Sequence, residues 1–460
     1  MKKTLVLALI LFFNITLYAQ DIIKEKVLYE STNNAQFYAM EGFPHIVDVG
    51  ARGFVIHTDG KFIRFDNELN KSWETESKYL SKTVKGAHNN TSEFVADHMA
   101  AYDIVQWISL GGLKPSEISV AAYSLEDGKA SSKNIPLVCE KDTKILKFFG
   151  LSDGLYYFKV TLNLKEKIVT HFLGKVDLEN GKVSETKLNL PYSAEELQGF
   201  LSSVDFEEKV FNIYNVGNDK IHLIKSSVDK KSDRLTITLG YIDKEGKYTS
   251  LAKSSVPEPD RINSFTNPSV NADTLNRVIY VTGYLTSSTG FKGIYFYTYS
   301  METGNPIASK ILFFDQLNLQ FKPSERLDEN IMFAETGMSY NYQSYKINSR
   351  HDMYNNLLHI GLVRRSDLVL GNGYKTIYIN PDGEVTEIAK IYSNKNGVEK
   401  VVLYTDKTRN IKTSVDFYEA HYPIDKKKVS VNYINRKDYM ILLDGREFKS
   451  KITAYKLRPR

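Results

Sequence analysis

Residues 277–313 read RVIYVTGYLTSSTGFKGIYFYTYSMETGNPIASKILF, which is three strand-like runs separated by two turn signals. The runs are rich in Val, Ile, Tyr, Phe and Thr, the residue types that favour β-strands. A Ser-Ser-Thr-Gly turn follows the first run, and Thr303-Gly304 follows the second. Glycine suits both turns because it tolerates positive φ. The stretch therefore predicts a three-stranded antiparallel meander.

The second turn of this stretch is one of seven similar turn signals along the chain. Each of them follows a β-prone run, and the turn-closing positions lie 53 to 79 residues apart. The seven turns are Asp66–Asn70, Asp127-Gly128, Asn180-Gly181, Glu245-Gly246, Thr303-Gly304, Asp382-Gly383 and Asp444-Gly445. A hairpin that recurs roughly every sixty residues indicates one supersecondary unit used about seven times.

A second meander is predicted from residues 155–162, 167–176 and 182–190. Both meanders leave room for a fourth strand ahead of them, and Val210–Tyr214 supplies one in the fourth unit. A sheet this small buries both faces only when it is packed between two neighbours. We therefore predict an all-β protein, a β-propeller of seven blades with three to four antiparallel strands each. The alternative is a pair of unrelated β-sandwich domains.

One unit carries a more specific pattern. Residues 267–273 read NPSVNAD and precede the apolar run Arg277–Val281, which resembles the first turn and second strand of a TolB-type propeller blade. In those blades a glycine follows the aspartate, whereas Thr274 follows Asp273 here. The resemblance covers one unit of the seven. It implies a propeller fold and, as in most TolB-like propellers, the binding of other proteins.

Three segments carry other expectations. A capping box at Ser193–Glu196 predicts a short helix. Residues 90–110 fit either a helix or a strand over 103–109, and the strand is preferred because it restores the repeat. The polar and aromatic stretch Gly337–Asn355 falls in the widest gap between turns, so we expect a long rim loop there.

The first 19 residues predict a signal peptide. Lys2 and Lys3 precede the apolar run 5–13, and Leu17-Tyr18-Ala19 provides a small-residue cleavage site. The apolar run is shorter than the roughly 20 residues that span a bilayer, although an N-terminal anchor is the alternative. No later segment has the length and apolarity of a membrane span. We therefore predict an exported protein, periplasmic, at the outer surface or extracellular, whose residues 20–460 form a single β-propeller domain.

Charge and cysteine content exclude several classes of protein. The net charge is +5, with 60 Lys and Arg against 55 Asp and Glu, so no strong basic field for nucleic acid is expected. The basic run Lys426–Lys428 is predicted to be a solvated hairpin rim. Cys139 is the only cysteine, which excludes an intrachain disulfide and predicts a small buried side chain. Stability must then come from a large hydrophobic core.

Most motifs of known chemistry are missing from the sequence. It contains no glycine-rich phosphate loop and no His-Glu-x-x-His, its nine histidines are scattered, and Gly150–Gly154 is its single match to Gly-x-Ser-x-Gly. We accordingly predict no catalytic, cofactor-binding or metal-binding residue. Three weaker sets of candidates remain. Carboxylates at a channel mouth could be Asp48, Asp103 and Asp205, and sugar-stacking tryptophans could be Trp73 and Trp107, although core packing explains the tryptophans better. The acidic segment Asp229–Asp233 could approach a calcium ion, although a hairpin turn explains it better.

These observations predict an exported, non-catalytic binding or scaffold module for a protein or glycan ligand. Tyrosine-rich rim loops would carry recognition, because tyrosine offers a large contact area at a low entropy cost. The alternative is a propeller glycoside hydrolase or lyase that uses carboxylates at the channel mouth. A structural component of a surface assembly is a third possibility.

Overall fold

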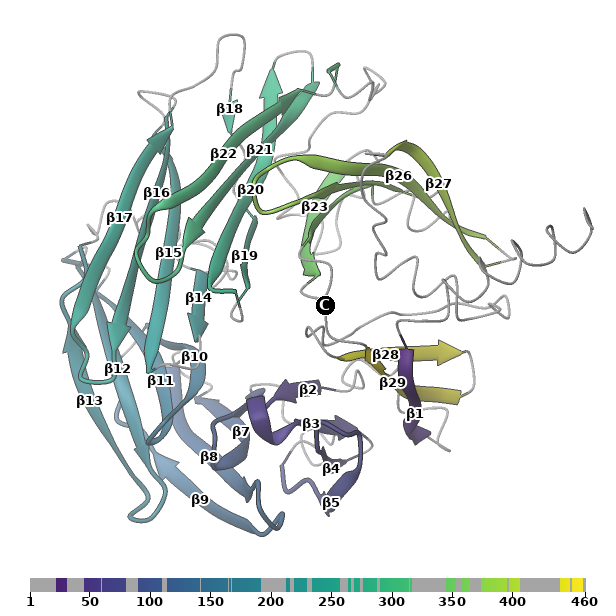
Figure 1. The fold of residues 1–460 in the computed structure, drawn as a ribbon. Helices are drawn as coiled ribbons and strands as arrows, with labels where there is room; N and C mark the ends of the chain where they lie inside the picture. Colours follow the sequence, from purple (N-terminus) through teal and green to yellow (C-terminus); the bar gives the residue numbers. More distant parts are fainter. Residues whose placement is uncertain are drawn as a thin grey trace, which may run out of the picture. The chain divides into compact units, whose positions relative to one another are not determined.

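The computed structural model describes the strands and most of the turns between them (Figure 1). The described residues are 22–30, 45–58, 60–79, 90–109, 114–140, 142–163, 165–166, 168–191, 212–215, 219–229, 234–256, 264–265, 269–273, 276–287, 290–313, 315–316, 345–352, 357–364, 374–394, 397–405, 439–446 and 449–457. Among them, the only helical element is the 3-10 turn η1 (Gly50–Arg52). The chain divides into unit 1 (Met1–Ala35, Ser288–Thr298 and Ala308–Arg460) and unit 2 (Gln36–Ser287 and Tyr299–Ile307).

Within the described ranges, the strands form seven antiparallel sheets. Three four-stranded sheets come first: β2 (His45–Asp48), β3 (Phe54–Thr58), β4 (Lys61–Phe65), β5 (Lys71–Glu76); β6 (Asn90–Ala96), β7 (Ala100–Ser109), β8 (Lys114–Ser124), β9 (Ala130–Pro136); β10 (Thr143–Leu151), β11 (Gly154–Asn163), β12 (Ile168–Asp177), β13 (Lys182–Leu188). The next two are β14 (Asn212–Asn215), β15 (Lys220–Asp229), β16 (Arg234–Asp243), β17 (Tyr248–Val256); β18 (Ser264–Phe265), β19 (Ser269–Asp273), β20 (Val278–Ser287), β21 (Gly290–Ser300), β22 (Pro306–Phe313).

The last two sheets contain the C-terminal strands. The sixth sheet follows sequence order, with strands β23 (Tyr345–Asp352), β24 (Leu357–Arg364), β25 (Tyr374–Ile379), β26 (Val385–Asn394) and β27 (Gly397–Thr405). The seventh has the order β1-β29-β28, with strands β1 (Ile22–Glu30), β28 (Tyr439–Arg446) and β29 (Lys449–Leu457). The N-terminal strand thus completes the C-terminal sheet. Consecutive meanders closed in this way are the topology of a β-propeller, so the predicted fold class is confirmed.

Most predicted strands match observed ones. The meander expected at 277–313 is β20, β21 and β22, and the one at 155–190 is β11, β12 and β13. The ambiguous stretch 90–110 contains two strands, β6 and β7, so the helical alternative was wrong. Part of the loop expected at Gly337–Asn355 is strand β23, and the remainder lies outside the described residues. The predicted helix at Ser193–Glu196 and the run Lys426–Lys428 also lie outside them.

Six of the seven predicted turns join the third and fourth strands of successive sheets. The closing glycines 128, 181, 246, 304 and 383 all have positive φ, and Leu69 takes this conformation in the first turn. The seventh prediction was wrong, because Gly445 lies inside β28 and pairs with Ser450 of β29. In that sheet the outer strand is β1, which comes from the other end of the chain. Strand β29 follows β28 directly and folds back beside it, with Arg446 opposite Lys449.

The five of these turns that close with a glycine pack against the outer strand of the preceding sheet. In unit 2, a Cβ placed on Gly246 would lie 2.7 Å from Thr186 Cγ2 on β13. A Cβ on Gly304 would lie 2.7 Å from Leu251 Cβ on β17. The same contact recurs in unit 1, where Gly383 lies against Lys310 of β22. Glycine is therefore required at these positions for two reasons. It tolerates the positive φ, and it lacks the Cβ atom that would clash with the neighbouring strand.

Hydrogen bonds reinforce the contact at the start of two turns. The carbonyl oxygen of Leu125 accepts a hydrogen bond from Trp73 Nε1 at 3.2 Å, from the preceding sheet. The carbonyl oxygen of Met301, at the equivalent position, is 3.0 Å from His222 Nε2 on β15. Both groups are buried. The turn that the sequence predicts therefore also connects its own sheet to the preceding one, and we call this contact the joint between the two sheets.

The core of unit 2 lies between successive sheets. One cluster joins the β2–β5 and β6–β9 sheets around Phe62, Trp73 and Tyr123. A second joins the β6–β9 and β10–β13 sheets around Ile104 and Tyr157, and a third joins the β10–β13 and β14–β17 sheets through residues such as Phe158. The β6–β9 and β10–β13 sheets therefore bury both faces against neighbours, as a repeat of this kind requires. This packing differs from that of a two-sheet sandwich.

The first strands of three consecutive sheets are also linked by charged side chains. The Glu93 carboxylate on β6 accepts a hydrogen bond from the backbone N–H of Phe148 on β10, at 3.2 Å. Lys147 Nζ on β10 donates to the carbonyl oxygen of Ile213 on β14, at 3.0 Å. Burial lowers the pKa of Lys147, and the nearby Glu93 opposes that shift. Both side chains satisfy backbone groups at the edge of the next sheet.

We predict that Gly128→Ala destabilises the protein by about 2–4 kcal/mol, whereas Gly50→Ala costs about 1 kcal/mol. The two glycines have similar φ, 72° and 68°. A Cβ at Gly128 would lie 2.9 Å from Trp73 Cδ2, whereas a Cβ at Gly50 would meet nothing within 4 Å. Urea unfolding of both variants measures the difference. Equal losses of unfolding free energy in the two variants would contradict the proposed role of the Gly128 turn as a contact between sheets.

Candidate functional site

Two of the three candidate channel carboxylates serve local structure. Asp48 is exposed, and its Oδ1 accepts a hydrogen bond from the N–H of Gly50 at 2.8 Å, next to η1. Asp103 on β7 is buried, and its Oδ2 accepts from Ser77 Oγ at 3.0 Å and from the N–H of Tyr79 at 2.9 Å. It therefore ties the segment after β5 to the next sheet. Asp205 lies outside the described residues.

The tryptophans and the cysteine are packing groups. Trp73 is buried and is held by the Gly128 turn, as described above. Trp107 is half-buried, and its Nε1 donates to Ser119 Oγ at 2.9 Å. Cys139 is buried in the cluster between the β6–β9 and β10–β13 sheets, which confirms the prediction for it. Of the acidic segment Asp229–Asp233, Asp229 ends β15, and the other residues lie outside the described residues.

Two histidines are buried among apolar side chains. His171 on β12 lies 5.8 Å from the ring of Phe158, and His222 lies 5.9 Å from the ring of Tyr241. The densest histidine group in the sequence is split between neighbouring strands, with His351 opposite Leu358 and His359 opposite Arg350. Among the described residues, no three His, Cys, Asp or Glu side chains are close enough together to hold a metal ion.

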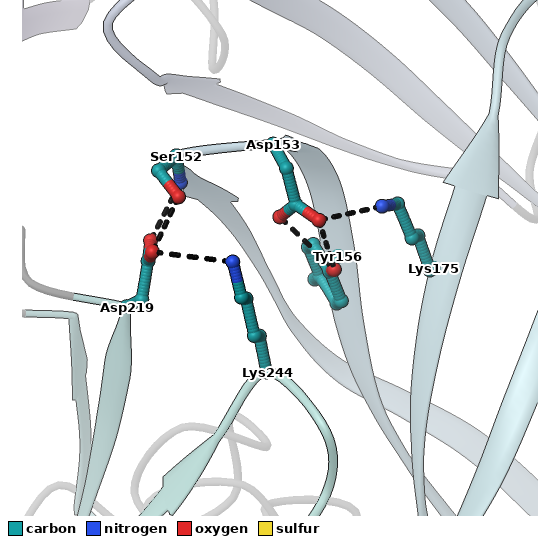
Figure 2. Close-up of polar contacts among 6 residues, drawn as sticks. All are labelled: Ser152, Asp153, Tyr156, Lys175, Asp219 and Lys244. Carbon is teal, nitrogen blue, oxygen red and sulfur yellow. Dashed lines mark hydrogen bonds and ion pairs between the residues drawn. The ribbon is translucent and has the colours of Figure 1, made fainter.

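The strongest cluster of polar side chains lies where the β10–β13 and β14–β17 sheets meet (Figure 2). We call it the rim cluster; its members are Ser152, Asp153, Tyr156, Lys175, Asp219 and Lys244. Ser152 and Asp153 belong to the turn between β10 and β11, and Asp219 directly precedes β15. Lys244 lies in the turn between β16 and β17. Both sheets belong to unit 2, so one compact unit builds the whole cluster.

One half of the rim cluster is centred on Asp153. Its Oδ2 accepts a hydrogen bond from Lys175 Nζ at 2.7 Å, and its Oδ1 accepts one from the hydroxyl of Tyr156 at 3.0 Å. Burial alone would raise the pKa of Asp153, but the hydrogen bonds from Lys175 and Tyr156 outweigh it and lower the pKa. The hydrogen bond to Asp153 is also the main cause of the raised pKa of Lys175.

The other half is centred on Asp219 and crosses between the sheets. The N–H of Ser152 donates to Asp219 Oδ1 at 2.7 Å, and the Ser152 hydroxyl is bonded to Oδ2. Lys244 Nζ lies 3.8 Å from the same Oδ2. Burial opposes ionisation, yet the bonds from Ser152 and the charge of Lys244 lower the pKa of Asp219. Asp219 itself has a positive φ of 57°, which is uncommon for a residue other than glycine.

The rim cluster presents fixed charges and no group ready to exchange a proton near neutral pH. Both aspartates are ionised and Lys175 is protonated, while burial and the bond to Asp153 raise the pKa of Tyr156. The four charged side chains remain 30–40% exposed. Such an arrangement can donate and accept charge-assisted hydrogen bonds to a polar ligand.

The sequence gives only a weak signal for the rim cluster. Asp153-Gly154 is an Asp-Gly pair like the predicted turns, but it joins the first and second strands of its sheet. Asp219 and Lys244 are 66 and 91 residues further on, and only the stacking of two sheets brings them to Ser152 and Asp153. No motif of fixed spacing connects them.

Comparisons with known proteins find solved structures that include β-propeller domains. The polysaccharide lyase Uly1 matches with a TM-score of 0.36 and 9% identity, covering 78% of this chain and 88% of that one. The propeller domain of the Trilobed protease from Pyrococcus furiosus matches at 0.33 and 10%, covering 82% and 96%. The WD40 domain of SCAP from fission yeast matches at 0.32 and 8%, covering 94% and 98%. Because these TM-scores and identities are low, the assignment of the fold class rests on the strand pairing described above.

No family model matches the chain, and no curated protein matches it either. The TolB-type character of residues 267–273 therefore stays a prediction, although Ser269–Asp273 and Val278–Ser287 are paired strands of one sheet, β19 and β20. In the part of the chain that the structure describes, no helix combines the length and apolar character of a membrane span.

We predict that the free energy of unfolding falls as the pH drops from 6.5 to 4. Burial lowers the pKa of His171 to about 4, so the folded state resists a proton that the unfolded state binds. The loss for this residue is about 3 kcal/mol. The pKa of His222 is also lowered by burial, which adds to the effect.

Urea unfolding at several pH values measures this dependence. His171→Gln should flatten the slope between pH 6.5 and 4. Leu188→Val, a substitution directly opposite His171 on β13, should lower stability by a similar amount at every pH. The carboxylates with lowered pKa lose their contribution progressively from about pH 5 downwards, mostly below this window, and His171→Gln leaves that loss in place. If the slope of the unfolding free energy against pH were unchanged in His171→Gln, the pH dependence could not be assigned to His171.

Proposed function

We propose that this chain is an exported β-propeller module that binds a polar ligand, a protein or a glycan, in the cell envelope or outside the cell. The rim cluster is its proposed contact site. The observation that supports this proposal is the set of four partly exposed charged side chains, held in place by Ser152 and Tyr156 across two sheets. A site on rigid strands and short turns is well suited to recognition.

The state of each group favours binding over proton transfer. A general base or acid works best with a pKa near the operating pH. In the rim cluster, the pKa shifts move Asp153, Asp219, Lys175 and Tyr156 away from neutrality. Each group therefore keeps one protonation state and one hydrogen-bonding role, which suits selection among polar ligands.

The rim cluster also holds two turns together, and this structural role must be separated from ligand binding. Asp219 joins the sheets through Ser152, whereas Lys175 contacts only Asp153 and the ring of Tyr156 within one sheet. Removing the Lys175 charge should disturb the joint less than removing Asp219. Lys175 is therefore the better probe of ligand contact, and Asp219 the better probe of the joint.

We predict that the chain from Gln20 onward binds a ligand from a glycan array or an envelope-protein pull-down, and that Lys175→Met weakens this binding about tenfold or more. Loss of one charge-assisted hydrogen bond costs about 1.5–3 kcal/mol. Lys71→Met is the matched control, because Lys71 also pairs with a carboxylate on an exposed strand surface, at 3.1 Å from Glu74 Oε2. It should change the affinity less than twofold.

Thermal unfolding of the same variants separates binding from folding. Lys175→Met should unfold within a few degrees of the unsubstituted chain while its affinity falls. Equal affinities for Lys175→Met and Lys71→Met would remove the rim cluster as the ligand site. Turnover of any polysaccharide by the unsubstituted chain would instead support the alternative, a glycoside hydrolase or lyase.

A further inference from the structure

Strand β1 holds the closing position in its sheet but has only one neighbour. It pairs antiparallel with β29, and the order of the sheet is β1-β29-β28 (Figure 1). All three strands belong to unit 1. The pairing joins residues 22–30 to residues 451–457, so it forms only when the two ends of the chain meet. Such a strand contributes nothing to its sheet until folding is otherwise complete.

The described side chains of β1 are less buried than those of its neighbour. Among the side chains of β1 that the structure describes, none is buried, and Val27 is 40% exposed. By contrast, Ile452 and Ala454 of β29 are fully buried. Burial is the main source of stability for a sheet strand. The described part of β1 therefore gains less from burial than β29 does.

The register between β1 and β29 is broken twice. One irregularity lies between Ile22 and Lys24, and the other lies between Val27 and Tyr29. Each bulge interrupts the ladder of hydrogen bonds. In addition, Lys24 lies directly opposite Lys456, so the pair contributes no cross-strand attraction of its own. The two bulges therefore weaken the pairing of β1 with β29.

We propose that β1 is an exchangeable strand, and that the edge of β29 also accepts β1 from a second copy of this chain. A second copy carries the same sequence, so its β1 makes the same pairs with β29, bulges included. The connection between Glu30 and His45 is about 14 residues long and can span on the order of 45 Å, enough to reach another molecule. The partner is therefore a reciprocal, strand-exchanged copy.

The protein concentration decides between the closed monomer and the strand-exchanged dimer. The tethered β1 of the same chain has an effective concentration in the millimolar range, so the closed monomer dominates in dilute solution. Exchange becomes significant when export or anchoring crowds copies together. A covalent trap detects it at lower concentration, because each rare exchange event is then captured.

The test uses cross-chain disulfide formation between opposed positions. Two chains from Gln20 onward carry Cys139→Ser, and one has Lys24→Cys while the other has Lys456→Cys. Directly opposed positions of an antiparallel pair are close enough for a disulfide. After mixing in a glutathione buffer, a disulfide between the two chains should accumulate. In the control, the Lys24→Cys chain is mixed with an Ile168→Cys chain, since Ile168 is 50% exposed on β12.

Strand exchange predicts cross-linking at least tenfold faster in the Lys24–Lys456 pair than in the control pair. Equal rates would mean random collision and would overturn the proposal. A single chain with both cysteines, oxidised beforehand, locks β1 in place and should no longer cross-link to the Lys456→Cys chain. Hydrogen exchange on the unsubstituted chain gives an independent readout. Amides of β1 should exchange at least tenfold faster than those of β11, and equally slow exchange would also overturn the proposal.

Discussion

The packing of a glycine turn against the preceding sheet is the contact on which the architecture depends. It recurs at Gly128, Gly246 and Gly304 in unit 2 and at Gly383 in unit 1. A sheet of four strands cannot bury both faces alone, so its stability comes from its neighbours. The turn sets how closely two neighbours approach, and the buried carbonyl groups of Leu125 and Met301 bind side chains of the preceding sheet. The glycine turn that recurs in the sequence thus forms a recurring contact between residues of consecutive sheets that are far apart in the chain.

The rim cluster shows how such joints bring polar side chains of two sheets together. Where two sheets stack, the turns that connect their first and second strands come together, and Ser152 then reaches Asp219. The charged groups around them are partly exposed and keep one protonation state. Chemistry of this kind suits the binding of a polar ligand. The closing strand β1 is a contrast, because among the described strands it pairs with β29 alone and none of its described side chains is buried.

Much of the fold could be predicted from sequence, because β-prone runs and glycine turns act locally. The meanders at 155–190 and 277–313 were found in this way, as was the strand within 90–110. The error at Asp444-Gly445 is one of position, because β28 continues through the Asp-Gly pair to Arg446, which pairs with Lys449 where β29 folds back beside it. The outer strand of that sheet comes from residues 22–30. The carboxylates expected at a channel mouth, Asp48 and Asp103, bind backbone groups and hydroxyls nearby.

The sequence by itself determined the strand type, the turn positions and the number of repeats, because backbone preferences are settled within a few residues. Tertiary structure alone decided which strand completes the last sheet and which polar side chains gather in the rim cluster. Those choices depend on pairs such as Ser152 with Asp219 or Ile22 with Leu457, which lie far apart in the chain. Serine, aspartate and lysine are common throughout this sequence, so no local pattern distinguishes the few that meet.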